Sequence, residues 1–138
     1  MNEYRFEEIE QGHKESFSVT VTEAMMDAFR TVTGDVNPLH ADDAFAKEQG
    51  YDGKVCFGML TAAFLSTLAG VYLPGKHSLI QSVEVKFSKP VYPGETLSVT
   101  GTVTETNDTF RFIKVKVEIK NAEGIKKAKA VMQIGVLE

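Results

Sequence analysis

The chain has 138 residues, of which 43% are hydrophobic and 25% charged, and this length and composition suit one globular domain with a buried core. Nineteen acidic residues against 15 basic ones give a net charge of −4, which argues against binding to nucleic acid or to anionic lipid. The single cysteine, Cys56, excludes an internal disulfide and a multi-cysteine zinc site. The chain does not open on a basic start followed by an apolar stretch, so we expect no secretory signal and a cytoplasmic location.

The first regular elements are predicted to be a strand and an amphipathic helix. Residues 16–21 alternate apolar and polar side chains, which is typical of a strand. Thr22 is of a type that favours the N-cap of a helix, and Gly34 favours the position after the last turn. Apolar residues recur at helical spacing between them: Met25, Ala28, Phe29 and Val32.

The segment 35–41, DVNPLHA, predicts an irregular turn. Proline restricts the residue before it to extended geometry, so Asn37 ahead of Pro38 bends the chain here. Asp42 and Gly50 then predict the start and the stop of a short helix over about residues 43–49.

Residues 55–75 contain no charged side chain, which by itself is compatible with a membrane-spanning helix. Glycine, serine and threonine dilute the segment, and one span would leave the alternating strands that follow unexplained, so we expect no membrane span. The sequence instead predicts a helix from about residue 58 to 71. It is apolar on nearly every side, so we expect it to be buried all round.

The second half of the chain alternates apolar and polar residues in four stretches, separated by turns at 93–94, 107–108 and 123–124. The apolar residues of these stretches are Val83, Val85 and Phe87; Leu97, Val99, Gly101 and Val103; Phe110, Phe112, Val115, Val117 and Ile119; and Ala128, Ala130, Met132 and Ile134. A phase slip near Ile113 suggests a bulge. The predicted class is α+β: a curved antiparallel sheet wrapped around one long buried central helix, with edge strands on which a second copy can dock.

The turn at 34–40 carries the residues best suited to catalysis. Asp35 and His40 lie five residues apart across the bend, and that spacing allows both side chains to converge on one small volume. A carboxylate and an imidazole that share a water can take a proton from it and return one elsewhere. Asn37 and Pro38 would keep the bend rigid, which matters because proton transfer needs hydrogen-bond distance.

Gly58 stands at the start of the predicted buried helix. The first amides of a helix have no partner inside it and carry the positive end of its dipole. A glycine there lets a ligand approach closely, so its N–H can stabilise an oxyanion forming on a carbonyl.

Each of these residues also has a purely structural interpretation. Asp35 can be an ordinary turn residue, His40 a half-buried loop histidine, and Gly58 a simple helix-terminal glycine. Ser66, two turns into the helix, can be a core hydroxyl bonded to a carbonyl. Cys56 is best interpreted as a small buried apolar residue.

Three stretches of the sequence resemble the MaoC-like family of R-specific enoyl-CoA hydratases: GDVNPLHADDAFA at 34–46, GML at 58–60 and FSKPVYPGETL at 87–97. The resemblance covers about residues 15–136. It implies a hot-dog fold in a single domain over residues 1–138. It also implies a homodimer or larger homo-oligomer with the substrate tunnel at the subunit interface.

By the same resemblance, Asp35 and His40 correspond to the catalytic pair that holds the water, and Gly58 to the glycine whose amide contacts the thioester oxygen. Ser66 corresponds to a helix serine that supports the site in some members, and we expect Asn37 to support the loop.

One position departs from the family pattern. The family usually has histidine before the glycine, whereas this chain has Phe57. With Met59 on the other side of Gly58, Phe57 is expected to line the substrate pocket and to change the polarity of its wall.

The implied activity is reversible syn addition of water to a trans-2-enoyl thioester, which gives the (R)-3-hydroxyacyl thioester in fatty acid metabolism. The carrier is coenzyme A or acyl carrier protein. No cofactor or metal is implied, because the thioester already polarises the substrate. Two alternatives stay open: an acyl-CoA thioesterase of the same fold, and a non-catalytic acyl-CoA binding or partner subunit.

Overall fold

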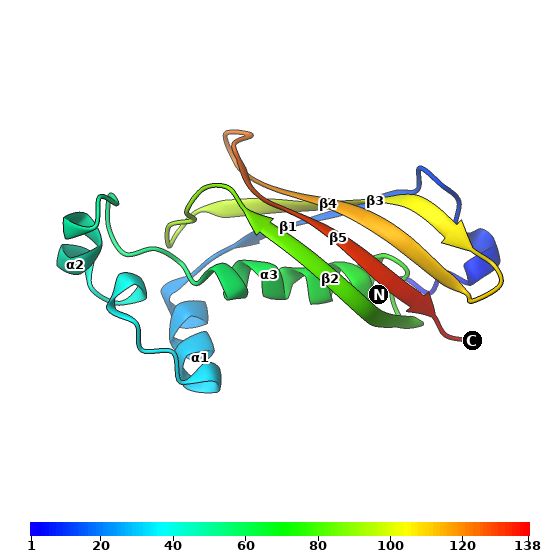
Figure 1. Ribbon diagram of the computed structural model, residues 1–138, viewed down its shortest axis with the longest axis horizontal. Coiled ribbons are helices and arrows are strands. Elements are labelled where there is room, and N and C mark those ends of the chain that lie inside the picture. Colours follow the sequence, from blue (N-terminus) through cyan, green and yellow to red (C-terminus); the bar gives the residue numbers. More distant parts are fainter.

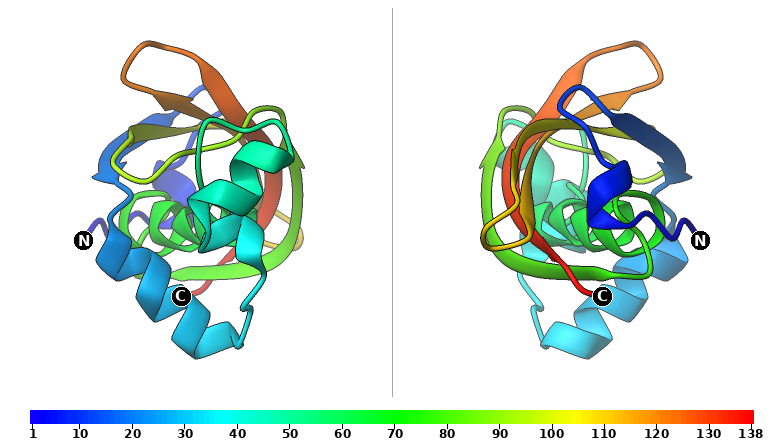
Figure 2. Two further views of the ribbon diagram at one scale, coloured as in Figure 1. Left: turned by 90° about the vertical axis from the view of Figure 1, so that its left-hand side faces the viewer. Right: turned by 90° about the vertical axis from the view of Figure 1, so that its right-hand side faces the viewer.

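One antiparallel sheet of five strands curves around a central helix in the computed structural model, which describes residues 1–138 (Figure 1). The strands are β1 (Lys14–Thr20), β2 (Ser78–Phe87), β3 (Thr96–Asn107), β4 (Phe112–Asn121) and β5 (Lys126–Val136). Their order in the sheet is β1-β3-β4-β5-β2, so β1 and β2 are the two edges and the sheet does not close into a barrel. Seen end-on, the strands curve around the helix α3 (Gly58–Thr67) (Figure 2). This is the predicted α+β hot-dog arrangement.

The caps predicted for the first two helices are confirmed. Thr22 Oγ1 accepts a hydrogen bond from the backbone of the first turn of α1 (Glu23–Thr33), and Gly34 ends that helix in the left-handed conformation at φ 73°. Asp42 caps α2 (Asp43–Glu48) in the same way, through two backbone N–H groups. A short 3-10 helix, Phe6–Glu8, precedes β1.

The core lies between the concave face of the sheet and α3. Its largest contributors from the sheet are less than 2% exposed: Leu97, Val99, Ile113, Ile119, Met132 and Ile134. α3 continues into a π-helical turn, Leu68–Tyr72, so the helical segment has nearly the predicted length. A β-carbon on Gly101 would lie 2.7 Å from Leu68 Cδ2, so glycine at this position of β3 lets the turn approach the sheet closely.

The expectation that the central helix is buried all round is wrong. Leu65 and Leu68 are at most 2% exposed, but Met59 is 65% exposed and Ala63 and Ser66 are also exposed. One copy of the sheet covers only one side of the helix, so the opposite apolar side remains open. No helix of the structure has both the length and the apolar character needed to cross a membrane.

The edge strand β2 also exposes apolar residues that were predicted to face a dry core. Val85 packs against the core, whereas Val83 is 44% and Phe87 50% exposed. Ile80, earlier on the strand, is 36% exposed. We call Ile80, Val83 and Phe87 the apolar edge.

A bulge does lie beside Ile113, but the neighbouring strand carries its extra residue. The pairing of β3 with β4 shifts by one residue at Thr104 in β3, opposite Lys114 and Val115. Ile113 is fully buried and in phase with the other inward residues of β4, whereas Phe110 lies in the preceding turn and is 74% exposed. The apparent slip within β4 came from two aromatic residues: Phe110 in the turn, and Phe112, the first residue of β4, which alternates with the inward Ile113.

Candidate active site

The segment between α1 and α2 is a turn held by its own side chains. Asp35 Oδ1 accepts the N–H of Asn37 at 3.0 Å, and Asn37 Oδ1 accepts the N–H of Leu39 at 2.9 Å. The second bond caps a 3-10 helix, Pro38–His40, so part of the turn that we expected to be irregular is helical. Asn37 therefore shapes the loop rather than lining a cavity.

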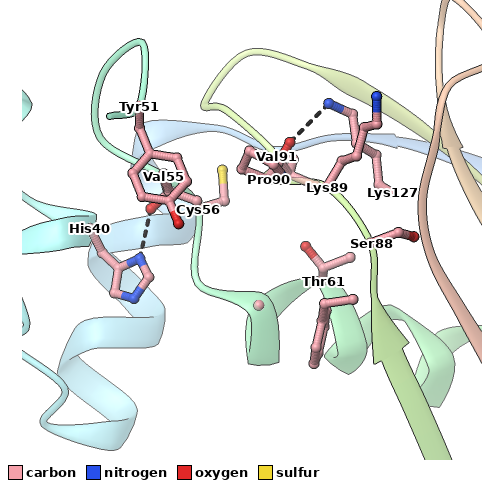
Figure 3. A pocket seen from close by; sticks show the side chains of 12 residues that line it. His40, Tyr51, Val55, Cys56, Thr61, Ser88, Lys89, Pro90, Val91 and Lys127 are labelled. Carbon is pink, nitrogen blue, oxygen red and sulfur yellow. Dashed lines mark hydrogen bonds between the residues drawn. The ribbon is translucent and has the colours of Figure 1, made fainter. Parts of the chain in front are cut away.

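Two contacts hold the ring of His40. Its Nδ1 lies 2.7 Å from the carbonyl oxygen of Val55, and its ring lies 4.4 Å from the Phe57 ring, centre to centre. A carbonyl oxygen can only accept, so Nδ1 carries the proton and Nε2 of the neutral ring is left as an acceptor. Figure 3 shows Nε2 on the side of the ring away from Val55.

Gly58 is the first residue of α3, and its N–H has no acceptor in the protein. Phe57 stands at the N-cap and makes no side-chain cap. It is 1% exposed and also packs against Phe29, with ring centres 4.7 Å apart. The residue that departs from the family pattern is therefore a buried aromatic support under His40.

Two neighbouring cavities meet at these residues. The first, which we call the loop cavity, has a volume of about 500 Å³ and is lined by Phe29, Thr33, Asp35, His40, Phe57, Gly58, Met59 and Phe87. The structure thus brings together Asp35, His40 and Gly58 with both predicted pocket residues. Ser66 lines neither cavity and lies exposed on the open side of α3.

The second cavity, which we call the lysine cavity, has a volume of about 290 Å³ and shares His40, Gly58 and Phe87 with the first. Figure 3 shows His40 and Tyr51 on one side of it and Lys89 and Lys127 on the other. The Lys127 ammonium is committed to the protein, since it donates to the Pro90 carbonyl at 2.8 Å and pairs with Glu95 at 3.3 Å. Lys89 makes no ion pair and is exposed.

Two buried residues of the lysine cavity differ in their chemistry. Cys56 is 2% exposed, and burial raises the pKa of its thiol to about 12, so it stays protonated and is a poor nucleophile at neutral pH. Thr61 is also 2% exposed and its hydroxyl makes no hydrogen bond within the protein, so it is available to a ligand.

Sequence reasoning missed Phe87 as a wall of both cavities and Tyr51 and Thr61 as lining residues. Lys89 could be named only as one of four scattered lysines able to meet a phosphate, and of those four it alone lines the lysine cavity. Phe87 could have been noticed, because it is the first residue of FSKPVYPGETL, one of the three stretches that carry the family resemblance. Tyr51 and Thr61 carry no local signal, because only the fold brings them to His40.

Comparison with known proteins agrees with this architecture. The sequence profile described as "MaoC like domain" matches residues 5–125. An (R)-specific enoyl-CoA hydratase of Rhodospirillum rubrum is 33% identical over 99 residues, which cover 72% of this chain and 69% of the relative. The corresponding enzyme of Aeromonas caviae is 35% identical over 96 residues, covering 70% and 72%.

Solved structures give the same result. An unliganded R-hydratase of Pseudomonas aeruginosa matches with a TM-score of 0.90 and 26% identity, covering 97% of this chain and 86% of the other. The (R)-hydratase of A. caviae matches with a TM-score of 0.88 and 28% identity, covering 93% and 97%. By sequence and by fold, the chain therefore belongs to the MaoC-like family, whose relatives include (R)-specific enoyl-CoA hydratases.

Proposed function

We propose that this protein is an R-specific enoyl-CoA hydratase that adds water reversibly across the C2–C3 double bond of a trans-2-enoyl thioester. The observation that carries the proposal is the meeting of Asp35, His40 and the free N–H of Gly58 at one cavity. Two proton acceptors beside an oxyanion donor suit addition to an activated carbonyl compound.

The water is oriented by two acceptors. The Asp35 carboxylate and Nε2 of His40 each accept one of its hydrogens, so a lone pair on the water oxygen faces C3 of the substrate. As the oxygen bonds to C3, one of the pair takes a proton and the electrons of the double bond move toward the thioester. The group that took the proton then returns it to C2 from the same side, which leaves the pair as it began, completes a syn addition and gives the (R)-3-hydroxyacyl thioester.

Negative charge develops on the thioester oxygen as the enolate forms. The N–H of Gly58 donates to that oxygen, at the positive end of α3. No reorganisation of the protein is needed to provide this donor, because the N–H has no partner to give up.

The two cavities suit the two ends of an acyl thioester. The loop cavity carries Asp35 and mostly apolar side chains, so it takes the acyl part, whereas exposed Lys89 at the lysine cavity suits a phosphate of the carrier. Coenzyme A and acyl carrier protein both provide such a phosphate.

We further propose that two copies pair through the apolar edge. Ile80, Val83 and Phe87 stand on an unpaired edge strand, and Phe87 and exposed Met59 line the loop cavity. A second copy docked there would cover the apolar side chains and close the cavity from water.

The test is a spectrophotometric assay with crotonyl-CoA, in which hydration removes the absorbance of the enoyl thioester. We expect loss of absorbance, no release of free thiol to DTNB, and an (R)-3-hydroxybutyryl product on chiral analysis. Thiol release at the rate of absorbance loss would instead identify a thioesterase. Binding without turnover would identify a non-catalytic subunit.

A further inference from the structure

Arg30 in the last turn of α1 connects three parts of the site. Its Nη1 pairs with Asp27 at 2.9 Å, and its Nη2 donates to the backbone carbonyl of His40 at 3.2 Å. Its guanidinium carbon lies 5.7 Å from the centre of the Phe57 ring. One planar side chain thus contacts the helix before the loop, the loop itself and the residue before Gly58.

These contacts complete the support of His40. Val55 holds Nδ1 of the ring, Phe57 lies against the ring face, and Arg30 holds the carbonyl oxygen of the same residue. Because Arg30 also lies over Phe57, the backbone support and the ring support form one connected unit.

The position of the Arg30 guanidinium removes one of its N–H donors from water. Nε of Arg30 is buried and has no hydrogen-bond partner, although the side chain as a whole is 26% exposed. An arginine that served only to pair with exposed Asp27 could leave Nε in water. Instead, Nη2 donates to the carbonyl oxygen of His40 while Nε of the same side chain stays buried without an acceptor.

We propose that Arg30 is a positioning residue for His40. It fixes the loop backbone and, with Phe57, the plane of the imidazole, so that Nε2 faces the loop cavity. A lysine cannot reproduce this, because a single ammonium lacks the planar group that donates to the His40 carbonyl while it lies over the Phe57 face. This role rests on the proposed function, in which His40 holds the attacking water.

The first test compares Arg30→Met with Asp27→Asn in the crotonyl-CoA assay. Methionine keeps an apolar stem over Phe57 but donates no hydrogen bond, whereas Asp27→Asn weakens the exposed ion pair and leaves the contact with His40 intact. We expect Arg30→Met to lower kcat by about 10–100-fold with little change in KM, since a misplaced catalytic group loses rate rather than binding. Asp27→Asn should keep the wild-type kcat. Arg30→Lys should have a kcat closer to that of Arg30→Met than to that of the wild type when the values are compared as logarithms.

The second test does not depend on turnover. The ¹⁵N shifts of the His40 ring report which nitrogen carries the proton, and we expect a fixed Nδ1–H form in the wild type and averaging between tautomers in Arg30→Met. Arg30→Gln, whose side chain is too short to reach the same carbonyl, serves as the second variant if Arg30→Met does not fold. Wild-type kcat together with an unchanged His40 spectrum in either variant would overturn the proposal. If the wild type does not hydrate crotonyl-CoA but the His40 spectrum changes in Arg30→Met as expected, the proposed hydratase function is wrong and the positioning role of Arg30 is still supported.

Discussion

The Phe87 ring lies against the backbone of Gly58. A β-carbon on Gly58 would meet ring atoms of Phe87 at 3.4 to 3.6 Å, and both residues line both cavities. The glycine at the start of α3 and the last residue of β2 are thus neighbours in the walls of both cavities, beside the proposed oxyanion donor.

Gly58→Ala should therefore impair turnover more than folding. The methyl group would stand beside the Phe87 ring in the cavity wall and hinder the approach of the thioester oxygen to the N–H, which we expect to lower kcat/KM by up to about 100-fold. Alanine is a better helix former than glycine, so the unfolding midpoint should not fall. Gly70→Ala is the control, because its added carbon meets Ser78 Oγ at an ordinary 3.8 Å. Equal activity of the two variants would contradict the role of Gly58.

Asp35→Asn and His40→Gln should each reduce kcat by about 10²–10⁴-fold, the range for a lost general acid or base. Asparagine can still accept the N–H of Asn37, so the loop should keep its shape. Asp42→Asn is a matched control, since Asp42 caps α2, lines neither cavity, and asparagine is an equally good cap. Circular dichroism checks the fold, and wild-type rates in both catalytic variants would refute the proposed site.

Local signals in the sequence were enough to predict the caps of the first two helices and the bend of the loop between them. The caps Thr22 and Asp42 act through their nearest neighbours, and the bend at Pro38 is a property of the peptide itself, so both could be predicted without tertiary contacts. The resemblance gave the hot-dog fold, which the strand order and solved structures bear out.

Features that depend on packing could not be predicted in this way. The apolar pattern of α3 and β2 was interpreted as burial, but Met59 and Val83 are exposed in a single copy of the chain. Phe110 matched a strand pattern from within a turn. The contacts of Arg30 with His40 and Phe57 join segments 10 and 27 residues away, and no local pattern in the sequence signals them.

The close packing of Gly101 should make β3 sensitive to the smallest added group. A methyl group there would lie 2.7 Å from Leu68 Cδ2 and 2.9 Å from Val115 Cγ1, both inside the core. We expect Gly101→Ala to lower the free energy of unfolding by about 1–3 kcal/mol, or the thermal midpoint by roughly 4–12 °C. A scan by circular dichroism measures this, and an unchanged midpoint would show that the helix end can shift freely.

The ion pair of Glu95 with Lys127 should contribute to acid sensitivity. Burial raises the pKa of Glu95, but hydrogen bonds from Asn121, the Tyr92 N–H and Lys127 outweigh it and hold the pKa below the usual 4.5. The unfolded chain therefore binds this proton first as the pH falls. The contribution to stability is complete above the unfolded pKa and is lost as the pH falls through the lower, folded-state value.

Glu95→Gln should accordingly be less stable than the wild type at pH 7, and the difference should shrink below about pH 4. Urea unfolding at a series of pH values measures both effects. Glu123→Gln, at an exposed turn without a side-chain ion pair, should follow the wild type throughout. A difference between Glu95→Gln and wild type that grew on acidification would have the wrong sign for this mechanism.

The apolar edge can be tested with two valines of similar exposure. Val83 on β2 is 44% exposed and faces the α3 side of the sheet, whereas Val131 on β5 is 49% exposed and faces outward, opposite Glu84. Val83→Lys should convert a dimer into monomers, because pairing would bury the new charge against apolar side chains. Val131→Lys should remain dimeric. Light scattering after size-exclusion chromatography gives the mass of each.

Monomeric Val83→Lys should also lose most turnover in the crotonyl-CoA assay, since its loop cavity would stay open to water. A fully active monomer would show that one copy completes the site.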